Sequence, residues 1–506
     1  MKKNLFALFV IVSSLALTGC SFFDFITTSN NSSYSPWEGG KQELTYTQKA
    51  LKENNYYTNY DSMPTTGNPK LLVLPIAFKN TCDFLDDEQK VQVKSDLNKM
   101  AFGTNDDTGW YSITTFYQAE SYGECNIQGE VADWYNCNYR YQDVNNSDIT
   151  ATIIKDAVNY WKINNPSKVK DFDSDNNGYL DGVLAIYGCP NYKNSSSVNS
   201  NMWAYTSWIE ETPNVANPNV NVFIWASYDF MDTDNSHGMV IDGHTYIHEM
   251  GHVMGLDDYY DYGSDTKVWA GGFSMQDYNV GGHDPYSMLV YGWVDPYVPT
   301  SSTSITLSPF ESSGDLILLS PDFSSNSAFD EYILVEFYTP TGVNERDSKY
   351  QYASKYPMGA NKPGIRIWHV DSRLLKLNET KKRGKDVTTY TITNTIDPED
   401  GSYTVGCTNT SYIPGDPKGT NSYCSLVSEL RDYKLLELIR RGDYLGNKTE
   451  EYFSDNYLFK AGDTFTLKQY SGYFKNLNKF NNGSRFNWTI RIDSVSDTSA
   501  KISVVL

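Results

Sequence analysis

The sequence predicts an α+β protein in two parts, a mixed sheet backed by helices and then a β-rich region. Short apolar runs alternate with amphipathic helical stretches from about residue 67 to a His-rich segment near residue 248, as in a sheet covered by helices. After residue 300, turns rich in Ser and Thr separate short alternating runs, which indicates a β-sandwich. A chain of 506 residues is also too long for one typical domain.

The first part begins with an apolar run over residues 71–78, which predicts a buried strand, and its Pro75 indicates an edge strand or a bulge. Asp86 or Asp87 can cap a helix that ends at Gly103. The next expected elements are a helix over 112–122, a strand over 126–135, a helix capped by Ser147, and strands over 182–187 and 221–225.

The second part contains short runs that read as strands over residues 316–319, 332–336 and 488–492. A stretch over 426–440 is expected to form a helix between them. This part carries no second set of catalytic residues. The sequence leaves open whether it covers the first part or binds substrate or glycan.

The N-terminus is expected to be a targeting segment. Lys2 and Lys3 precede an apolar core over residues 5–17, and the following Thr-Gly-Cys20 ending resembles a bacterial lipobox. This pattern implies cleavage before Cys20 and lipidation of its thiol, which places the protein on the bacterial cell surface. The alternatives are an ordinary signal peptide or a transmembrane anchor, but the apolar run is short for a span.

These observations divide the chain at three points. Residues 1–19 form the predicted signal peptide, and residues 20–66 form a tether that is rich in Ser, Asn and Thr in its first half. A first domain is expected over residues 67–299 and the β-rich domain over residues 300–506.

Net charge and cysteine content indicate which partners and which cross-links the protein can have. A net charge of −21 and a pI near 4.7 argue against a nucleic-acid partner. Six cysteines remain besides Cys20, an even number that permits disulfides in an exported chain. Their pairing is not defined by the sequence, although 125–137 and 407–424 would close the shortest loops.

The sequence His248-Glu249-Met-Gly-His252 matches the H-E-x-x-H pattern. Random placement of 6 His and 62 acidic residues would produce it about 0.01 times in a chain of this length. Residues four apart share one helix face, so both His can bind one Zn²⁺ ion. Glu249 can then act as the base toward a water of lowered pKa. The alternative is a surface helix on which the two His are solvated. His244, which precedes the pattern on the same helix, is expected to be a polar surface residue.

The third zinc ligand is expected just after this helix. Gly255 can end the helix in a left-handed conformation. Asp257 and Asp258 follow, and successive side chains of an extended segment point to opposite faces, so only one of the two can face the metal.

A second metal site is expected between two elements of the first domain. Counted from Asp173, the loop carries oxygen-bearing side chains at alternating positions and Gly178 at position 6, as in calcium loops. The expected Ca²⁺ ligands are Asp173, Asp175, Asn177, Tyr179 and Asp181. Position 12 is Leu184 rather than Glu, so the loop is no complete EF-hand, and an empty Asx-rich turn is the alternative.

Several of these segments resemble the immune inhibitor A family of bacterial metalloproteases, within the metzincin group. The likeness is strongest over residues 242–293 and extends over roughly residues 70–500. It rests on the Asp-ended zinc pattern, the Gly271–Tyr278 turn with its Met, and His283-Asp-Pro-Tyr-Ser followed by Gly-Trp-Val.

The resemblance implies a metzincin-like catalytic domain and roles for further residues. Met275 would lie in the Met-turn beneath the zinc, with Met288 as the alternative, and Tyr278 is a candidate transition-state donor. The family spacing places the third zinc ligand at Asp258. The family usually has Pro where this chain has Asp257.

The sequence therefore predicts a zinc-dependent metalloendopeptidase on the cell surface, with a protein or peptide as substrate. Two alternatives remain. The first is a surface adhesin or glycan-binding protein that uses a protease fold as a scaffold. The second is a zinc hydrolase that acts on peptidoglycan peptides.

Overall fold

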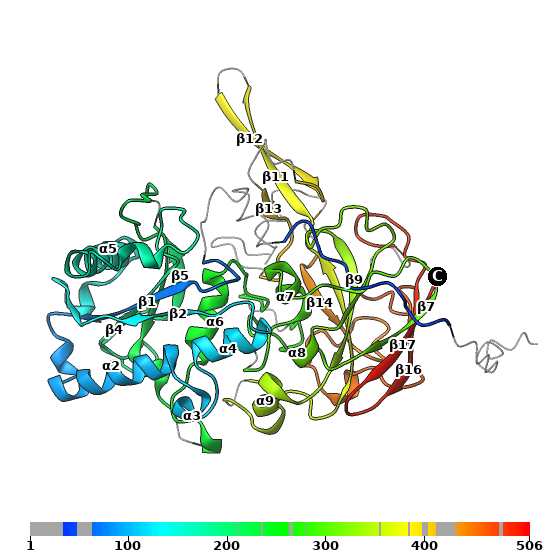
Figure 1. The fold of residues 1–506 in the computed structure, drawn as a ribbon, viewed down its shortest axis with the longest axis horizontal. Helices are drawn as coiled ribbons and strands as arrows, with labels where there is room; N and C mark the ends of the chain where they lie inside the picture. Colours follow the sequence, from blue (N-terminus) through cyan, green and yellow to red (C-terminus); the bar gives the residue numbers. More distant parts are fainter. Residues whose placement is uncertain are drawn as a thin grey trace, which may run out of the picture.

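The computed structural model describes residues 34–47, 63–209, 211–233, 236–262, 267–278, 280–353, 356–382, 385–396, 403–410, 430, 433–474 and 479–506. The predicted signal peptide, Cys20 and Cys424 lie outside these residues. The described chain is a mixed α/β structure whose two parts lie side by side (Figure 1).

The first part is built on a six-stranded sheet with the order β2-β1-β4-β6-β5, in which β3 pairs with β1 beyond the end of β2. All pairs are parallel except that of β5 with β6, which makes β5 an antiparallel edge strand. The strands are β1 (Lys70–Ala77), β2 (Gln128–Val131), β3 (Tyr135–Asn136), β4 (Gly182–Tyr187), β5 (Tyr205–Trp208) and β6 (Val222–Ser227).

Helices cover both faces of this sheet. Neighbouring residues of β1 and β4 point to opposite faces, so each of these strands contributes side chains to both cores. On one face Leu72 and Leu74 share a core with α5 (Ser147–Asn164). On the other face Leu71 and Val73 share a core with the remaining helices of this part. These are α2 (Asp87–Phe102), α4 (Ile113–Glu120), α6 (His244–Val253) and α7 (Pro285–Tyr291), while α3 (Asn105–Thr108) follows α2.

Helix and strand positions in this part mostly agree with the expectations. Asp86 caps α2 and Gly103 ends it, but Asn146 rather than Ser147 caps α5. The edge or bulge expected from Pro75 is wrong, since β1 is an interior strand. Pro75 is tolerated there because β2 pairs only as far as Val73 and pairing with β3 begins at Ile76, so the ladder on that side is interrupted at the proline.

The second part contains two four-stranded antiparallel sheets, with the orders β14-β10-β9-β8 and β15-β16-β17-β7. Facing residues of both sheets, such as Ile333 and Ile490, belong to one buried cluster. The strands are β7 (Thr303–Leu307), β8 (Leu316–Leu319), β9 (Glu331–Tyr338), β10 (Gly364–Asp371), β14 (Leu436–Ile439), β15 (Thr464–Phe465), β16 (Thr489–Val495) and β17 (Ala500–Val505), with short helices α8 (Phe310–Ser313) and α9 (Glu345–Lys349).

The helix expected over residues 426–440 is wrong where the chain is described. Leu436–Ile439 is β14, whose residues are all buried and pair with β10. The backbone bonds and apolar faces supplied by β10 outweigh the local preference for helix.

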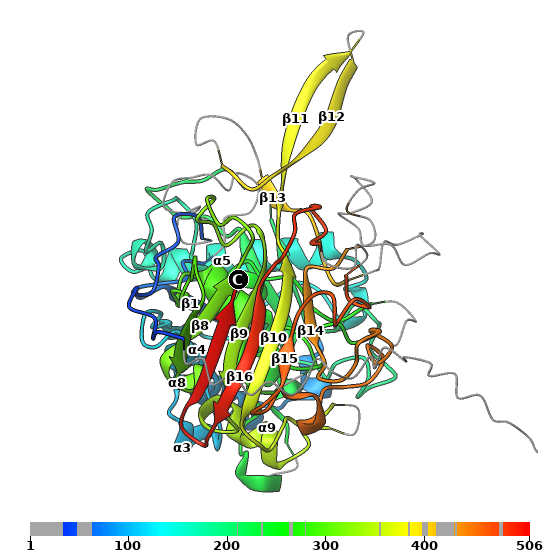
Figure 2. The ribbon, with the colours of Figure 1, turned by 90° about the vertical axis from the view of Figure 1, so that its right-hand side faces the viewer.

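A third sheet projects from the second part as a long ribbon (Figure 2). It consists of β11 (Leu374–Lys382), β12 (Lys385–Thr393) and β13 (Tyr403–Val405) in the order β12-β11-β13. Where the burial of this sheet is described, its buried residues are Leu374, Leu375 and Tyr403.

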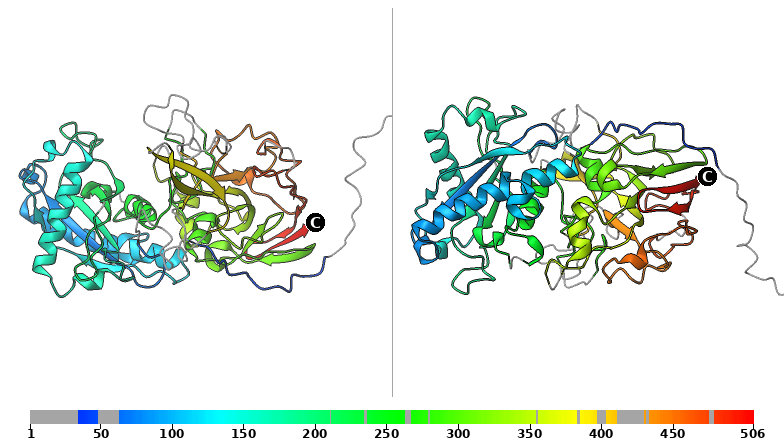
Figure 3. Two further views of the ribbon diagram at one scale, coloured as in Figure 1. Left: turned by 90° about the horizontal axis from the view of Figure 1, so that it is seen from above. Right: turned by 60° about the horizontal axis from the view of Figure 1, so that its bottom comes forward.

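Residues 34–47, part of the expected tether, lie along the second part (Figure 3). The backbone N–H of Trp37 donates to the Ser304 carbonyl at 2.8 Å, and that of Thr45 donates to the Asn326 carbonyl at 2.9 Å. This stretch therefore packs on the protein instead of forming a free tether.

One buried cluster also continues from the first part into the second, from Leu71 through α6 to Trp368 and Leu458. The described halves therefore share an apolar core. Of the described helices, none is both long and apolar enough to cross a membrane. The pair Cys125 and Cys137, one of the two shortest closures open to the sequence, forms no disulfide, and the Cys137 thiol lies 3.7 Å from the Tyr139 carbonyl oxygen.

Candidate metal centre

Helix α6 begins beside a buried carboxylate and ends at a glycine. Asp242 Oδ1 accepts a 2.9 Å hydrogen bond from the backbone N–H of His244, which would otherwise lack a partner in the first turn. At the other end Gly255 has φ +105°, and the Leu256 N–H reaches back to the Gly251 carbonyl at 3.0 Å. This bond pattern ends a helix at a left-handed glycine. The chain then turns and carries the next carboxylates back to the helix.

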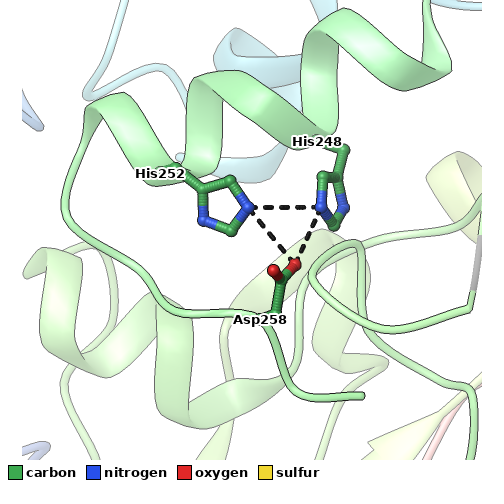
Figure 4. A group of neighbouring side chains, drawn as sticks. All are labelled: His248, His252 and Asp258. Carbon is green, nitrogen blue, oxygen red and sulfur yellow. Dashed lines mark hydrogen bonds and ion pairs between the residues drawn. The ribbon is translucent and has the colours of Figure 1, made fainter. Parts of the chain in front are cut away.

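Three side-chain atoms converge on one point beside α6 (Figure 4). His248 Nε2 lies 3.0 Å from Asp258 Oδ1, His252 Nε2 lies 3.2 Å from the same oxygen, and the two Nε2 atoms are 3.3 Å apart. All three side chains are largely buried. The three residues expected to bind zinc are therefore brought together.

Backbone carbonyls determine which nitrogen of each ring faces this point. His248 Nδ1 lies 2.7 Å from the Met275 carbonyl oxygen, and His252 Nδ1 lies 2.8 Å from the Leu256 carbonyl oxygen. A carbonyl only accepts, so each Nδ1 carries the proton, and in the neutral rings both Nε2 lone pairs face Asp258. Either a proton on one ring or a metal cation between the three atoms would satisfy this arrangement, and such carbonyl contacts commonly orient metal-binding His.

The spacing of these atoms fits a zinc ion. Tetrahedral Zn²⁺ binds N and carboxylate O at about 2.0–2.2 Å, which separates any two ligands by about 3.3 Å. The three observed separations of 3.0–3.3 Å match this value. Three protein ligands also leave the fourth position of a tetrahedral ion for water or substrate.

Asp258, not Asp257, reaches the His pair. Asp257 is exposed, whereas Asp258 is 7% exposed. Burial alone would lower the pKa of His252, but the Asp258 carboxylate outweighs it and raises that pKa to about 10. Burial opposes ionisation of Asp258, yet the two His hold the pKa of Asp258 well below its usual range. Asp258 is therefore an anion at any pH near neutrality.

Glu249 is buried next to the His pair, and a residue not identified from the sequence orients it. The Thr206 hydroxyl donates to Glu249 Oε2 at 2.9 Å and also lies 3.1 Å from the Glu249 carbonyl oxygen. Thr206 lies on β5, the edge strand. Nothing in the local sequence connects Thr206 to Glu249, because the contact spans 43 residues.

Met275 lies in a buried turn below His248. Its side chain is fully buried and its carbonyl holds the His248 ring, as described above. The next residue, Gln276, donates from Nε2 to the His248 carbonyl at 3.1 Å. A Cβ at Gly251 would lie 2.3 Å from Gln276 Oε1, so a larger residue there would displace the Gln276 side chain that bonds to the helix. Met288 lies instead on α7.

Three tyrosines surround the centre, of which the sequence indicated only Tyr278. Burial and then the Asp277 charge raise the pKa of Tyr278 to about 12, so it is a protonated donor at neutral pH. The Tyr262 hydroxyl donates to Asp258 Oδ2, and the Tyr260 ring stacks 6.2 Å from that of His248. The dense run of Tyr directly after Asp258 was the available signal for the latter two.

A cleft of about 580 Å³ opens over the centre. It is lined by α6, by β5 and by aromatic side chains from several segments. The aromatic lining residues are Trp203, Tyr205, Trp208, Phe230, Tyr260, Tyr262, Tyr278 and Tyr356. The described lining contains no Lys or Arg.

The expectation that His244 is a polar surface residue is wrong, because His244 is 5% exposed and lines this cleft. One helical turn before His248, it faces the same side of α6. His283 and His369 are buried away from the centre, paired with Glu120 and with Glu331 at 3.2 Å and 3.0 Å.

A second cluster of acids lies in the Asp-rich loop before β4. Oxygens of Asp173, Asp175 and Asp181 lie within 4.8 Å of one another. Ligands on opposite sides of one Ca²⁺ ion are up to about 5 Å apart, so the three can share an ion. Burial raises the pKa of Asp181 to about 7, which a bound cation would reverse.

The same loop is also held by its own hydrogen bonds. Asp173 accepts from the backbone N–H groups of Asn177 and Gly178 at 2.9 and 3.0 Å. Asn177 Oδ1 accepts from the Tyr179 N–H at 2.8 Å, and the Tyr179 hydroxyl donates to the Glu211 carbonyl. An Asx-rich turn without an ion therefore stays an alternative.

Comparison with protein-family models and with curated proteins finds no match for this chain. The functional proposal therefore depends on the geometry of the site.

Proposed function

We propose that the protein is a zinc-dependent metalloendopeptidase of the metzincin type. The observation that carries this proposal is the convergence of His248 Nε2, His252 Nε2 and Asp258 Oδ1, with both Nδ1 protons held by carbonyls and with Glu249 alongside. When bound, a zinc ion supplies Lewis acidity and lowers the pKa of a water molecule to about 7.

Glu249 supplies the proton transfer in this proposal. Its carboxylate, oriented by Thr206, accepts the proton of the attacking water and returns it to the leaving amine. Tyr278 and Tyr262 are protonated phenols at the cleft, and either can donate a hydrogen bond to the developing oxyanion. The His and Asp side chains hold their positions throughout.

An extended peptide is the substrate that the cleft favours. β5 is the edge strand of the sheet, and Tyr205, Thr206 and Trp208 of β5 line the cleft. The outer edge of such a strand can pair with the backbone of an extended chain. This arrangement would place a peptide bond next to Glu249 and the metal.

The finer fold assignment belongs to this proposal. The parallel sheet with one antiparallel edge strand, the helix broken at Gly255 and the turn at Met275 support a metzincin-like domain. The single buried cluster between the two four-stranded sheets supports a β-sandwich in the second part. The resemblance to the immune inhibitor A family is consistent with both.

We further propose that the enzyme is a lipoprotein on the bacterial cell surface. The support is the Thr-Gly-Cys20 ending of the N-terminal apolar segment, which lies outside the described residues. No nucleic acid is expected as a partner, given a net charge of −21.

A surface adhesin or glycan-binding protein is the second candidate, because a cleft walled by aromatic rings also suits sugar rings. A hydrolase of peptidoglycan peptides is the third. Hydrolysis of casein and of cell-wall peptides by the purified protein, with and without chelator, separates the three. We expect chelator-sensitive cleavage of casein. Cleavage of cell-wall peptides alone would favour the third candidate, and tight glycan binding without hydrolysis the second.

Glu249→Gln is the matched control. It preserves the shape of the side chain and the zinc ligands but removes the base, so the rate should fall by about 10²–10⁴ while the bound zinc stays unchanged. Near-normal turnover by this variant would contradict the mechanism.

A further inference from the structure

One wall of the cleft comes from the second part of the chain. Tyr356, which follows α9, lines the cleft together with Tyr278 and His244. The Tyr356 ring lies 6.1 Å from that of Tyr278 and 5.7 Å from that of His244, edge-on to both. A residue about 100 positions after the zinc-binding pattern therefore forms part of its surroundings.

A single carboxylate holds this wall against α6. The Tyr352 hydroxyl donates to Asp242 Oδ2 at 2.7 Å, while Oδ1 of the same carboxylate accepts from the His244 N–H. The Tyr352 ring also lies 4.9 Å from that of Tyr356. Asp242 thus links the start of the zinc-binding helix to the segment that carries Tyr356.

Contacts on either side fix the same segment. Arg346 donates to the His237 carbonyl at 3.0 Å, and the Tyr350 ring stacks on the His237 ring at 4.0 Å. After the wall, the Tyr338 hydroxyl donates to the Ala360 carbonyl at 2.6 Å. Tyr356 is therefore positioned before any substrate arrives.

The mouth of the cleft carries several aromatic side chains that are partly exposed to solvent. Trp203 and Tyr452 are each 40% exposed, and Tyr262 is 48% exposed. Trp203 and Tyr262 line the cleft, and Tyr452 contacts the Tyr278 ring at 6.2 Å. Exposed aromatic rings gathered at one opening indicate a site for an apolar ligand.

From this arrangement, and resting on the endopeptidase function proposed above, we infer that Tyr356 and Tyr278 form a specificity subsite for an aromatic side chain of the peptide substrate, next to the scissile bond. Aromatic side chains favour edge-on and offset contacts with rings at 4.5–7 Å. Both rings line the cleft, so an aromatic side chain that enters the cleft can contact them edge-on or offset. Tyr352 and Asp242 are positioning residues, which act through Tyr356.

The test compares peptides that differ at one residue beside the cleaved bond, Phe or Ala, with the wild type, Tyr356→Ala and Tyr352→Phe. For the Phe peptide, Tyr356→Ala should raise KM about 3- to 10-fold and leave kcat nearly unchanged. For the Ala peptide, neither constant should change. Tyr352→Phe removes only the hydroxyl and should shift the Phe peptide in the same direction, by less.

Tyr350→Ala is the control, because Tyr350 belongs to the same segment and stacks on His237 without lining the cleft. It should leave the preference between the two peptides unchanged. Zinc content and melting temperature of each variant show that the site stays folded. Equal effects of Tyr356→Ala on the Phe and Ala peptides would overturn the inference, as would a loss of preference in Tyr350→Ala.

The same peptides separate this inference from the proposed function. Their equilibrium binding is measured by fluorescence anisotropy on Glu249→Gln with and without Tyr356→Ala. If the wild type hydrolyses neither peptide, the proposed function fails. Tighter binding of the Phe peptide that Tyr356→Ala abolishes would still support the subsite, whereas equal binding of both peptides would overturn it.

Discussion

At the scale of single residues, Asp258 brings the one negative charge into the group of converging atoms. Its Oδ1 atom lies 3.0 and 3.2 Å from the Nε2 atoms of His248 and His252. Without this charge, two neutral imidazoles alone would have to bind the ion. Its neighbour Asp257 is exposed and does not belong to the group of converging ligand atoms.

We therefore predict that Asp258→Ala lowers zinc occupancy and peptidase activity together, while Asp257→Ala changes either only modestly. Metal analysis of the two purified variants, alongside casein hydrolysis, provides the measurement. Loss of zinc from Asp257→Ala with retention in Asp258→Ala would reverse the assignment.

Much of this centre could be predicted from residues close together in the sequence. The pair His248 and His252 follows from helix periodicity, and Asp258 from the turn at Gly255. Thr206 and Tyr356 could not be predicted, because a strand far upstream and a loop far downstream bring them to the site. Local spacing carries no information about such contacts.

At the scale of the elements, α9 carries a buried acid close to the cleft wall. Asp347 is 4% exposed, and its Oδ1 atom has no hydrogen-bond partner among the described residues. Burial raises the pKa of Asp347 from 3.8 to about 8. The folded protein therefore binds a proton that the unfolded chain releases above about pH 4.

This shift predicts a pH-dependent loss of stability. The contribution of the protonated Asp347 is complete below about pH 4 and is lost as pH rises to about 8, a change of a few kcal/mol. Asp347→Asn should remove it. The difference in melting temperature between this variant and the wild type should grow from pH 4 to pH 8 and then level off. A difference independent of pH would contradict the prediction.

The Asp-rich loop gives a second prediction at this scale. If it holds Ca²⁺, Asp173→Asn with Asp175→Asn should abolish stabilisation by added Ca²⁺ and leave zinc bound. The wild type should gain RT ln(1 + [L]/Kd), about 2.7 kcal/mol at 100 times Kd. Asn keeps only one of the two oxygens with which Asp173 accepts from Asn177 and Gly178, so the gain on adding Ca²⁺ is compared with the calcium-free stability of the same variant.

Asp443→Asn is the matched control for the calcium measurement. Asp443 accepts backbone hydrogen bonds from Asn447 and Lys448 at 3.0 Å in a similar turn, without belonging to a cluster of acids. Its Ca²⁺ response should equal that of the wild type. An unchanged response in the Asp173 and Asp175 double variant would exclude this loop as the calcium site.

The helices and strands were predicted correctly where capping residues gave a strong local signal. They were predicted wrongly where pairing with another strand determined the conformation. Asp86 and Gly103 define α2 through capping, which depends on a few neighbouring residues. Pro75 and Leu436–Ile439 were misread because their conformation depends on partner strands more than 50 residues away. Pairing of this kind outweighs intrinsic preference.

At the scale of the whole molecule, both halves contribute to one buried core and to the lining of the cleft. A shared buried cluster crosses the junction, and the second half adds Tyr356 to the cleft. The sequence divided the chain near residue 300 but gave no sign that the second half would reach the metal centre. Contacts between distant segments depend on packing that neither half shows alone.

The proposed lipid anchor is tested on the full chain. Cys20→Ala should move the protein from the membrane fraction to the soluble fraction or leave the precursor unprocessed, and labelling with a fatty-acid analogue should disappear. Label that persists on this variant would show that Cys20 is not the acylated residue.

Because residues 34–47 pack on the second half, the folded protein can lie only a limited distance from Cys20. Thirteen residues separate Cys20 from Tyr34, so the two lie at most about 50 Å apart even when the chain between them is fully stretched. The segment joins the protein beside β7, at the side opposite the parallel sheet of the first half (Figure 1). If Cys20 carries the lipid, the anchored chain enters the folded protein through the β-rich half, whereas the candidate metal centre lies on α6 of the other half. The proposed active site would then lie in the half that is not joined directly to the anchor.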